Sequence, residues 1–125
     1  MLKAPFYTVA SLDLEILALD GCTLVRVPGP RLDAASAPAL KNAVVDLANA
    51  GKLRVVVSLS RVEQIDSSGL GALIALHKTL EPPRGRLVIC EVPAKVQPIL
   101  KLTRLDRILA QAADPAAAAA LASAG

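Results

Sequence analysis

The chain has 125 residues, which is the size of one domain that can bury a continuous core. Hydrophobic residues make up 54% and charged residues 20%, a balance that excludes a disordered protein. Aromatic residues make up only 2%, so the core must be aliphatic, and a stacking platform for single-stranded nucleic acid is missing.

The net charge of +3 is mild, and most basic residues are scattered along the chain. One loose basic group is explained about as well by solvated faces as by a phosphate-binding surface. Its members are Arg84, Arg86, Lys95, Lys101, Arg104 and Arg107.

Cys22 and Cys90 lie in apolar runs without the spacing of metal ligands, which indicates buried free thiols in a reducing cytosol. The first residues lack the apolar segment of a signal peptide, and charged residues or proline interrupt every apolar run. We therefore expect a soluble cytoplasmic protein with no metal site, no cofactor and no membrane insertion.

The first part of the chain predicts a β-hairpin. Residues 1–11 give no more than a possible edge extension. Alternating apolar residues over 12–19 predict a strand, and the Asp-Gly pair at 20–21 predicts a tight turn into a second strand over 22–27.

A helix is expected next. Asp33 and Ser36 both suit its N-cap, and Pro38 favours the later start because a proline deeper in the helix would remove a hydrogen bond. An apolar stripe at helical spacing then continues to Gly51, which is typical of a helix C-terminus.

The remaining pattern alternates buried strands with helices. A nearly continuous apolar, β-branched run predicts a central strand covered on both faces. The expected elements are a strand over 53–59, a helix up to residue 80, a strand over 85–90, a helix over 93–105 with Pro98 in its first turn, a short edge strand over 106–109 and a weak alanine-rich helix after Pro115.

This order, β-β-α-β-α-β-α-(β)-α, predicts one α/β domain with a mixed sheet of four to five strands and a layer of helices. We expect an N-terminal extension at 1–11, the domain at 12–110 and an alanine-rich tail at 111–125.

Polar side chains and glycines are concentrated in the corner, defined as residues 65–71 with the sequence Ile-Asp-Ser-Ser-Gly-Leu-Gly. A nucleophilic serine needs a general base within reach, but His77, the one histidine, follows Ser67 by ten residues on the same helix, about 15 Å along its axis. The order of residues also matches neither a nucleophile elbow nor a phosphate-binding P-loop. We therefore expect no catalytic residues and no enzyme activity.

The helix that follows has two faces. A broad apolar stripe, formed by Leu70, Leu73, Ile74, Leu76 and Leu80, should pack on the sheet. The opposite face carries small or flexible side chains, which suit either close packing within the domain or a docking surface for another protein; its members are Ser68, Gly71, Ala75 and Lys78.

Ser67 also has two interpretations. It suits a helix N-cap, with Asp66 as the alternative cap. It also suits a phosphorylation acceptor, because the free N–H groups of a helix N-terminus tolerate the added negative charge. Phosphate there would leave the fold intact while repelling an acidic or apolar partner.

The corner, after a valine-rich strand and a short connection, resembles the bacterial anti-sigma factor antagonist family, whose fold is the STAS domain. The resemblance extends over about residues 12–109 and includes the Leu-Asp pair at 32–33 and the segment 102–106. Two departures are an extra residue between Gly29 and Leu32 and Arg104 in place of a common glycine, where a left-handed backbone would cost about 1 kcal/mol.

The resemblance implies partner switching in transcription regulation. The unphosphorylated protein would bind an anti-sigma factor that is also a serine kinase, thereby releasing a sigma factor. The kinase would phosphorylate Ser67, and a Ser/Thr phosphatase would restore it. The expected partner-binding residues are Asp33, Asp66, Ser67, Ser68, Gly69, Gly71, Ala75 and Lys78.

One alternative keeps the fold without the switch. The chain would then be a constitutive STAS subunit of a larger assembly, such as a stress-signalling scaffold or a lipid-transport complex, with the small face of the helix docked permanently.

Overall fold

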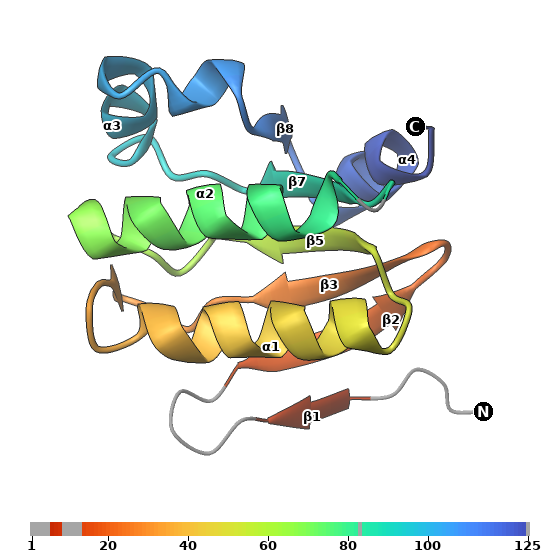
Figure 1. Ribbon diagram of the computed structural model, residues 1–125. Helices are drawn as coiled ribbons and strands as arrows, with labels where there is room; N and C mark the ends of the chain where they lie inside the picture. Colours follow the sequence, from red (N-terminus) through yellow and green to blue (C-terminus); the bar gives the residue numbers. More distant parts are fainter. Residues whose placement is uncertain (1–5, 9–13, 83, 125) are drawn as a thin grey trace.

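A six-stranded sheet with the order β1-β2-β3-β5-β7-β8 forms the centre of the computed structural model, which describes residues 6–8, 14–82 and 84–124 (Figure 1). β1 (Phe6–Thr8), β2 (Glu15–Leu19) and β3 (Cys22–Arg26) are antiparallel neighbours, whereas β5 (Arg54–Ser58), β7 (Arg86–Cys90) and β8 (Ala110–Ala112) continue the sheet parallel to β3. The predicted mixed α/β fold is confirmed, although the sheet has six strands rather than four or five.

Helices cover both faces of this sheet. α1 (Ala37–Asn49) and α2 (Ser67–Leu80) lie side by side on one face, over a core that includes Val55 and Val57 of β5. α4 (Pro115–Ala124) covers the other face, where Val56 packs with Ala118 and Ala122. Because successive strand residues point to opposite faces and both faces are covered, the three central residues of β5 are all apolar, which explains the valine run of the central strand.

The start of α1 agrees with the later of the two predicted positions. Ser36 is the N-cap residue and Pro38 lies in the first turn. The Ser36 hydroxyl donates to the carbonyl oxygen of Arg31 at 3.0 Å instead of capping the helix. Asp33 supports the turn that leads into α1, because its Oδ1 accepts from the backbone N–H of Ala35 at 3.0 Å.

The C-terminal third differs from the sequence prediction. α3 (Gln97–Leu102) is a six-residue helix rather than one over 93–105, although Pro98 lies in its first turn as expected. The 3-10 helix η1 (Leu105–Arg107) occupies the first half of the segment predicted as an edge strand, and the edge strand β8 comes later. Arg104 has a left-handed backbone with φ of 62°, two residues after the end of α3, and it therefore adopts the conformation considered for this position.

The alanine-rich segment belongs to the packed structure. β8 crosses the expected boundary at residue 110, and α4 lies against β3, β5 and β7. Ala118 and Ala122 are completely buried. Their small side chains allow the helix to approach the sheet closely. β1 shows that the N-terminal extension includes an edge strand, while the other residues of 1–13 lie outside the described part.

A second, smaller sheet lies at the carboxyl ends of the parallel strands. It consists of β4 (Arg31–Leu32) and β6 (Gln64–Ile65), which pair in parallel through Arg31 with Gln64 and Leu32 with Ile65. Sequence analysis did not predict these strands. They connect the segment before α1 to the segment before α2, and they therefore fix the position of the corner.

Candidate functional site

The pairing of β4 with β6 brings two acidic residues to the same place. Asp33 and Asp66 each follow a paired residue, Leu32 and Ile65, and the backbone N–H of Asp66 donates to the carbonyl oxygen of Leu32 at 3.3 Å. Both aspartates border one open depression of about 450 Å³, which Ile99 of α3 also lines. This pairing therefore places Asp33 beside the corner.

Asp66 is the N-cap of α2. Its backbone is extended, and its Oδ1 accepts from the backbone N–H of Gly69 at 3.0 Å. Of the two candidate caps, Asp66 and not Ser67 is therefore used, and Ser67 is the first residue of the helix. Ser67 is exposed, and its hydroxyl makes no hydrogen bond within 6–8, 14–82 and 84–124.

Gly69 is buried against the second sheet. A Cβ at this position would lie 2.3 Å from the carbonyl oxygen of Leu32 and 2.7 Å from a side-chain carbon of Ile65. Close packing of α2 on β4 therefore explains this glycine without reference to a partner. Its expected contact with another protein stays a prediction.

Gly71 has the opposite environment. It is exposed, and a Cβ at this position would meet no atom of the described residues within 4 Å. Gly71 and Ser68 line an open depression of about 370 Å³ between the starts of α1 and α2. The α1 side of this depression, which sequence analysis did not identify, consists of Ala34, Ala37, Pro38 and Lys41.

Only the first two residues of the small face of α2, Ser68 and Gly71, lie at the depression between the helices. Lys78 is exposed and Ala75 is half-buried, and neither lines the depression between the helices. Eleven residues separate Lys78 from Ser67, which places it about 16 Å further along the helix. A partner that contacts both residues would have to lie along the length of α2.

The predicted apolar stripe of α2 packs against the core, with different degrees of burial along it. Leu73, Leu76 and Leu80 are buried as expected, whereas Leu70 and Ile74 are half-buried. Gly69 and Ala72 are also buried, because α2 packs against α1 and β4 as well as against the sheet.

His77 lies at the far end of α2. Its Nδ1 is 4.0 Å from Oε2 of Glu81, one turn later on the same helix, and its side chain is partly exposed. This geometry agrees with the helical spacing and leaves the histidine well separated from Ser67.

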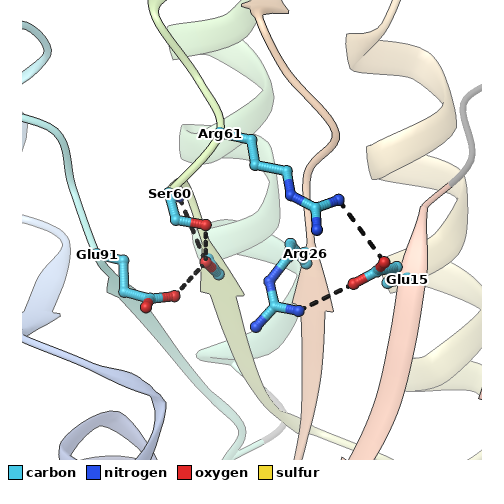
Figure 2. Close-up of polar contacts among 6 residues, drawn as sticks. Glu15, Arg26, Ser60, Arg61 and Glu91 are labelled. Carbon is cyan, nitrogen blue, oxygen red and sulfur yellow. Dashed lines mark hydrogen bonds and ion pairs between the residues drawn. The ribbon is translucent and has the colours of Figure 1, made fainter.

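A second polar cluster lies at the carboxyl ends of β3 and β5, and sequence analysis did not identify it (Figure 2). Arg26 contacts Glu15 at 2.9 Å, and Arg61 contacts the same carboxylate at 3.7 Å. The buried Ser58 hydroxyl donates to Oε1 of Glu91 at 2.6 Å. These contacts tie β2, β3 and the connection after β5 together, so they hold the segment that leads into the corner.

The two cysteines are buried free thiols, as predicted. Burial and the neighbouring Glu91 carboxylate raise the pKa of Cys90 to about 11, and burial together with Asp20 raises the pKa of Cys22. Both thiols are therefore neutral at ordinary pH and weakly reactive.

No helix of the described residues is both long and apolar enough to span a bilayer. Within the same residues, no group of three His, Cys, Asp or Glu side chains is arranged to hold a metal ion.

Comparison with known proteins agrees with this geometry. The sequence profile of the STAS domain matches residues 13–119. A putative anti-sigma factor antagonist from Thermotoga maritima is 32% identical over 87 residues, which cover 69% of this chain and 77% of the relative. A putative anti-sigma factor antagonist from Bordetella bronchiseptica is 29% identical over 102 residues, which cover 82% of this chain and 87% of the relative.

Among solved structures, an anti-sigma factor antagonist from Mycobacterium paratuberculosis superposes with a TM-score of 0.78 at 25% identity, covering 93% of this chain and 98% of that one. The fold, the corner and the profile match over most of the sequence lead to one conclusion. This chain belongs to the STAS domain family, among relatives described as anti-sigma factor antagonists.

Proposed function

We propose that this protein is a cytoplasmic anti-sigma factor antagonist that uses the corner to bind an anti-sigma factor with serine kinase activity. Phosphorylation of Ser67 ends this binding and a Ser/Thr phosphatase restores it. The observation that carries the proposal is the state of Ser67, which is exposed at the first position of α2 while Asp66 supplies the cap. Because the serine hydroxyl is not required by the helix, it is available for modification.

The consequence of phosphorylation follows from the charges around Ser67. A phosphate adds about −1.5 to −2 charges at pH 7. The N-terminus of α2 tolerates this charge through its free N–H groups and its dipole. Asp66 is the adjacent residue and Asp33 lies across the β4–β6 pair, so the modified surface becomes strongly negative. A partner that docks over these carboxylates would be repelled while the domain stays folded.

Gly71 supports a docking surface beside Ser67. A glycine inside a helix costs about 0.5–1 kcal/mol relative to alanine, and nothing in the described residues restricts the space above Gly71. The fold therefore has no use for a glycine here. Close approach of another protein to α2 is the explanation that we adopt, and the depression between α1 and α2 gives this partner its place.

We propose a regulatory role without enzyme activity. The one histidine of the chain is almost three helical turns from Ser67, so the serine lacks the general base that a nucleophile requires. In this scheme the partner kinase supplies the phosphorylation chemistry, and the protein supplies the acceptor.

Modification of Ser67 can be tested directly. Incubation with the cognate kinase and ATP should add one phosphate, which intact-mass measurement detects. Ser67→Ala should abolish the addition, whereas Ser68→Ala should still accept one phosphate. Phosphate addition to Ser67→Ala at the wild-type level would contradict the proposal.

The binding switch needs its own experiment. Ser67→Asp should keep the circular dichroism spectrum of the wild type and bind the anti-sigma factor at least tenfold more weakly in calorimetry. Ala120→Asp adds the same charge on the exposed side of α4 and should bind like the wild type. Equal binding by Ser67→Asp and the wild type would favour the constitutive subunit instead.

A further inference from the structure

Four cationic side chains line two depressions at the end of the parallel strands that is opposite to the corner. Figure 1 shows the two ends of β5 and β7. Lys52 precedes β5, Arg54 begins β5, Arg84 lies between α2 and β7, and Arg86 begins β7. Two open depressions of about 420 and 430 Å³ share Arg54 and Arg84 in their walls. Lys52 also lines the first depression, and Arg86 also lines the second. The one carboxylate among the lining residues, Glu81, belongs to the second depression.

Arg54 and Arg86 form a like-charge pair. They lie directly opposite each other in the register of β5 and β7. Both point to the face covered by α4, because Ala122 of that helix lines the second depression together with them. Like charges at directly opposed positions of neighbouring strands destabilise a sheet. The fold alone gives no reason for this arrangement.

The charge of this pair has little compensation within the described part of the chain. The ion pairs found there are Glu15 with Arg26 and Arg61, and His77 with Glu81. Arg54 donates one weak hydrogen bond, 3.5 Å long, to the carbonyl oxygen of Ser123. The Nε atom of Arg86 is buried and has no hydrogen-bond partner among the described residues, which adds to the cost of holding this arginine here.

Arg84 adds a third cation from a strained position. Its φ is 68°, in the left-handed region that favours glycine, yet the chain has an arginine there. This backbone conformation places the residue in the wall shared by the two depressions. A strained non-glycine residue is retained where its side chain has a use.

The side chains present specify the chemistry of a ligand. Guanidinium groups bind phosphate and carboxylate through paired hydrogen bonds, and each depression has the volume of a small-molecule site. The described walls contain no aromatic side chain on which a nucleobase could stack. Two adjoining depressions with shared arginines suit two anionic groups.

We infer that this basic edge binds a small soluble polyanion that carries at least two phosphate-type groups. The inference does not depend on partner switching, because the basic edge lies at the opposite end of the sheet from Ser67. The loose basic group identified in the sequence therefore falls into two separate places in the fold. Arg84 and Arg86 belong to this edge, whereas Lys95, Lys101, Arg104 and Arg107 lie in and around α3 and η1.

Pyrophosphate is the probe for the first experiment, titrated into the isotope-labelled full chain at 150 mM NaCl and followed by NMR. We expect saturable binding with a Kd below about 1 mM, since three arginines and a lysine surround the site. Backbone amides of residues 51–54 and 84–86 should shift, while those of residues 66–71 should not. The absence of saturable binding would overturn the inference.

Paired variants test the residues. Arg54→Gln combined with Arg86→Gln should weaken pyrophosphate binding at least tenfold. Lys101→Gln combined with Arg107→Gln removes the same charge elsewhere and should change Kd by less than twofold. If both double variants lost the same pyrophosphate affinity, the binding would depend on net charge alone, which would contradict a specific site. Arg84→Gly relieves the strained backbone, should fold like the wild type and should still weaken binding several-fold.

A vesicle experiment identifies the source of the anionic groups. Vesicles of phosphatidylglycerol and phosphatidylcholine should retain no more protein than vesicles of phosphatidylcholine alone. Retention by the anionic vesicles in the absence of pyrophosphate binding would replace the soluble ligand with a membrane surface and overturn the inference.

Discussion

At the scale of single residues, Gly69 and Gly71 lie two positions apart and serve different purposes. Gly69→Ala should lower the free energy of unfolding by about 1–3 kcal/mol, because its Cβ would overlap the carbonyl oxygen of Leu32. Gly71→Ala should raise it by about 0.5–1 kcal/mol, because the new Cβ enters open space and alanine favours the helix. Urea denaturation measures both, and a loss of stability in Gly71→Ala would show that the fold needs this glycine.

The division of labour between Asp66 and Ser67 gives a second residue-scale prediction. Asp66→Ala removes the cap of α2 and should cost about 0.5–2 kcal/mol of unfolding free energy. Ser67→Ala should change it by less than about 0.5 kcal/mol, because the hydroxyl is outside the hydrogen-bond network of the described residues. A larger loss in Ser67→Ala than in Asp66→Ala would reverse the assignment of the cap.

The sequence placed an acid and a serine at the helix start, but it could not say which of them caps. Both residue types make the same hydrogen bond, and the choice depends on where β6 ends. The open position of Gly71 was equally hidden, since spacing shows that a residue faces outward but not what lies above it. The hydrogen bond from the Gly69 N–H to Asp66 supplied the first answer, and the space that the described residues leave empty around a Cβ at Gly71 supplied the second.

At the scale of secondary-structure elements, α4 has a larger structural role than the sequence predicted. Composition predicted a weak terminal helix, whereas the structure uses it to cover the sheet through Ala118 and Ala122. Ala118→Leu should lower the free energy of unfolding by about 1–3 kcal/mol, because the larger side chain would force α4 away from β5 and β7. Ala120→Leu, on the exposed side, is the control and should change it by less than about 0.5 kcal/mol. Equal stability of the two variants would contradict the packing of α4.

The other differences in elements have common physical causes. β4 and β6 have two residues each, too few for an alternating pattern, so only tertiary pairing reveals them. The third helix was expected over 93–105, but α3 begins only at Gln97 and ends at Leu102, shortly before the left-handed Arg104. The central strand β5 was recognisable because burial on both faces requires consecutive apolar residues, here three valines.

At the scale of the whole molecule, the two ends of the parallel strands have different chemistry. The carboxyl end carries Asp33, Asp66 and the exposed Ser67, and the amino end carries the basic edge with Arg54 and Arg86. The general α/β order and the first of these ends could be derived from the sequence. The second could not, because Arg54 and Arg86 are separated by more than thirty residues and meet only through strand register.

The stability of the whole domain should depend on alkaline pH through Cys90. Its pKa is raised from 9.0 to about 11 in the folded protein, so the unfolded chain loses this proton first as pH rises. The free energy of unfolding should therefore fall between about pH 9 and pH 11, by roughly 2 kcal/mol from this thiol. Denaturation of the wild type and of Cys90→Ala across this range isolates the effect. Parallel pH curves for the two proteins would contradict it.

The short β4–β6 ladder has an evolutionary consequence. It anchors Asp33 and Asp66 by two residue pairs, while the chain before it, from Gly29 onward, carries one residue more than the family pattern. Length changes upstream of the ladder can therefore alter the surface beside Asp33 without displacing Ser67. Under the proposed function, the loop before the ladder is therefore the place where partner choice changes while the switch at Ser67 is kept.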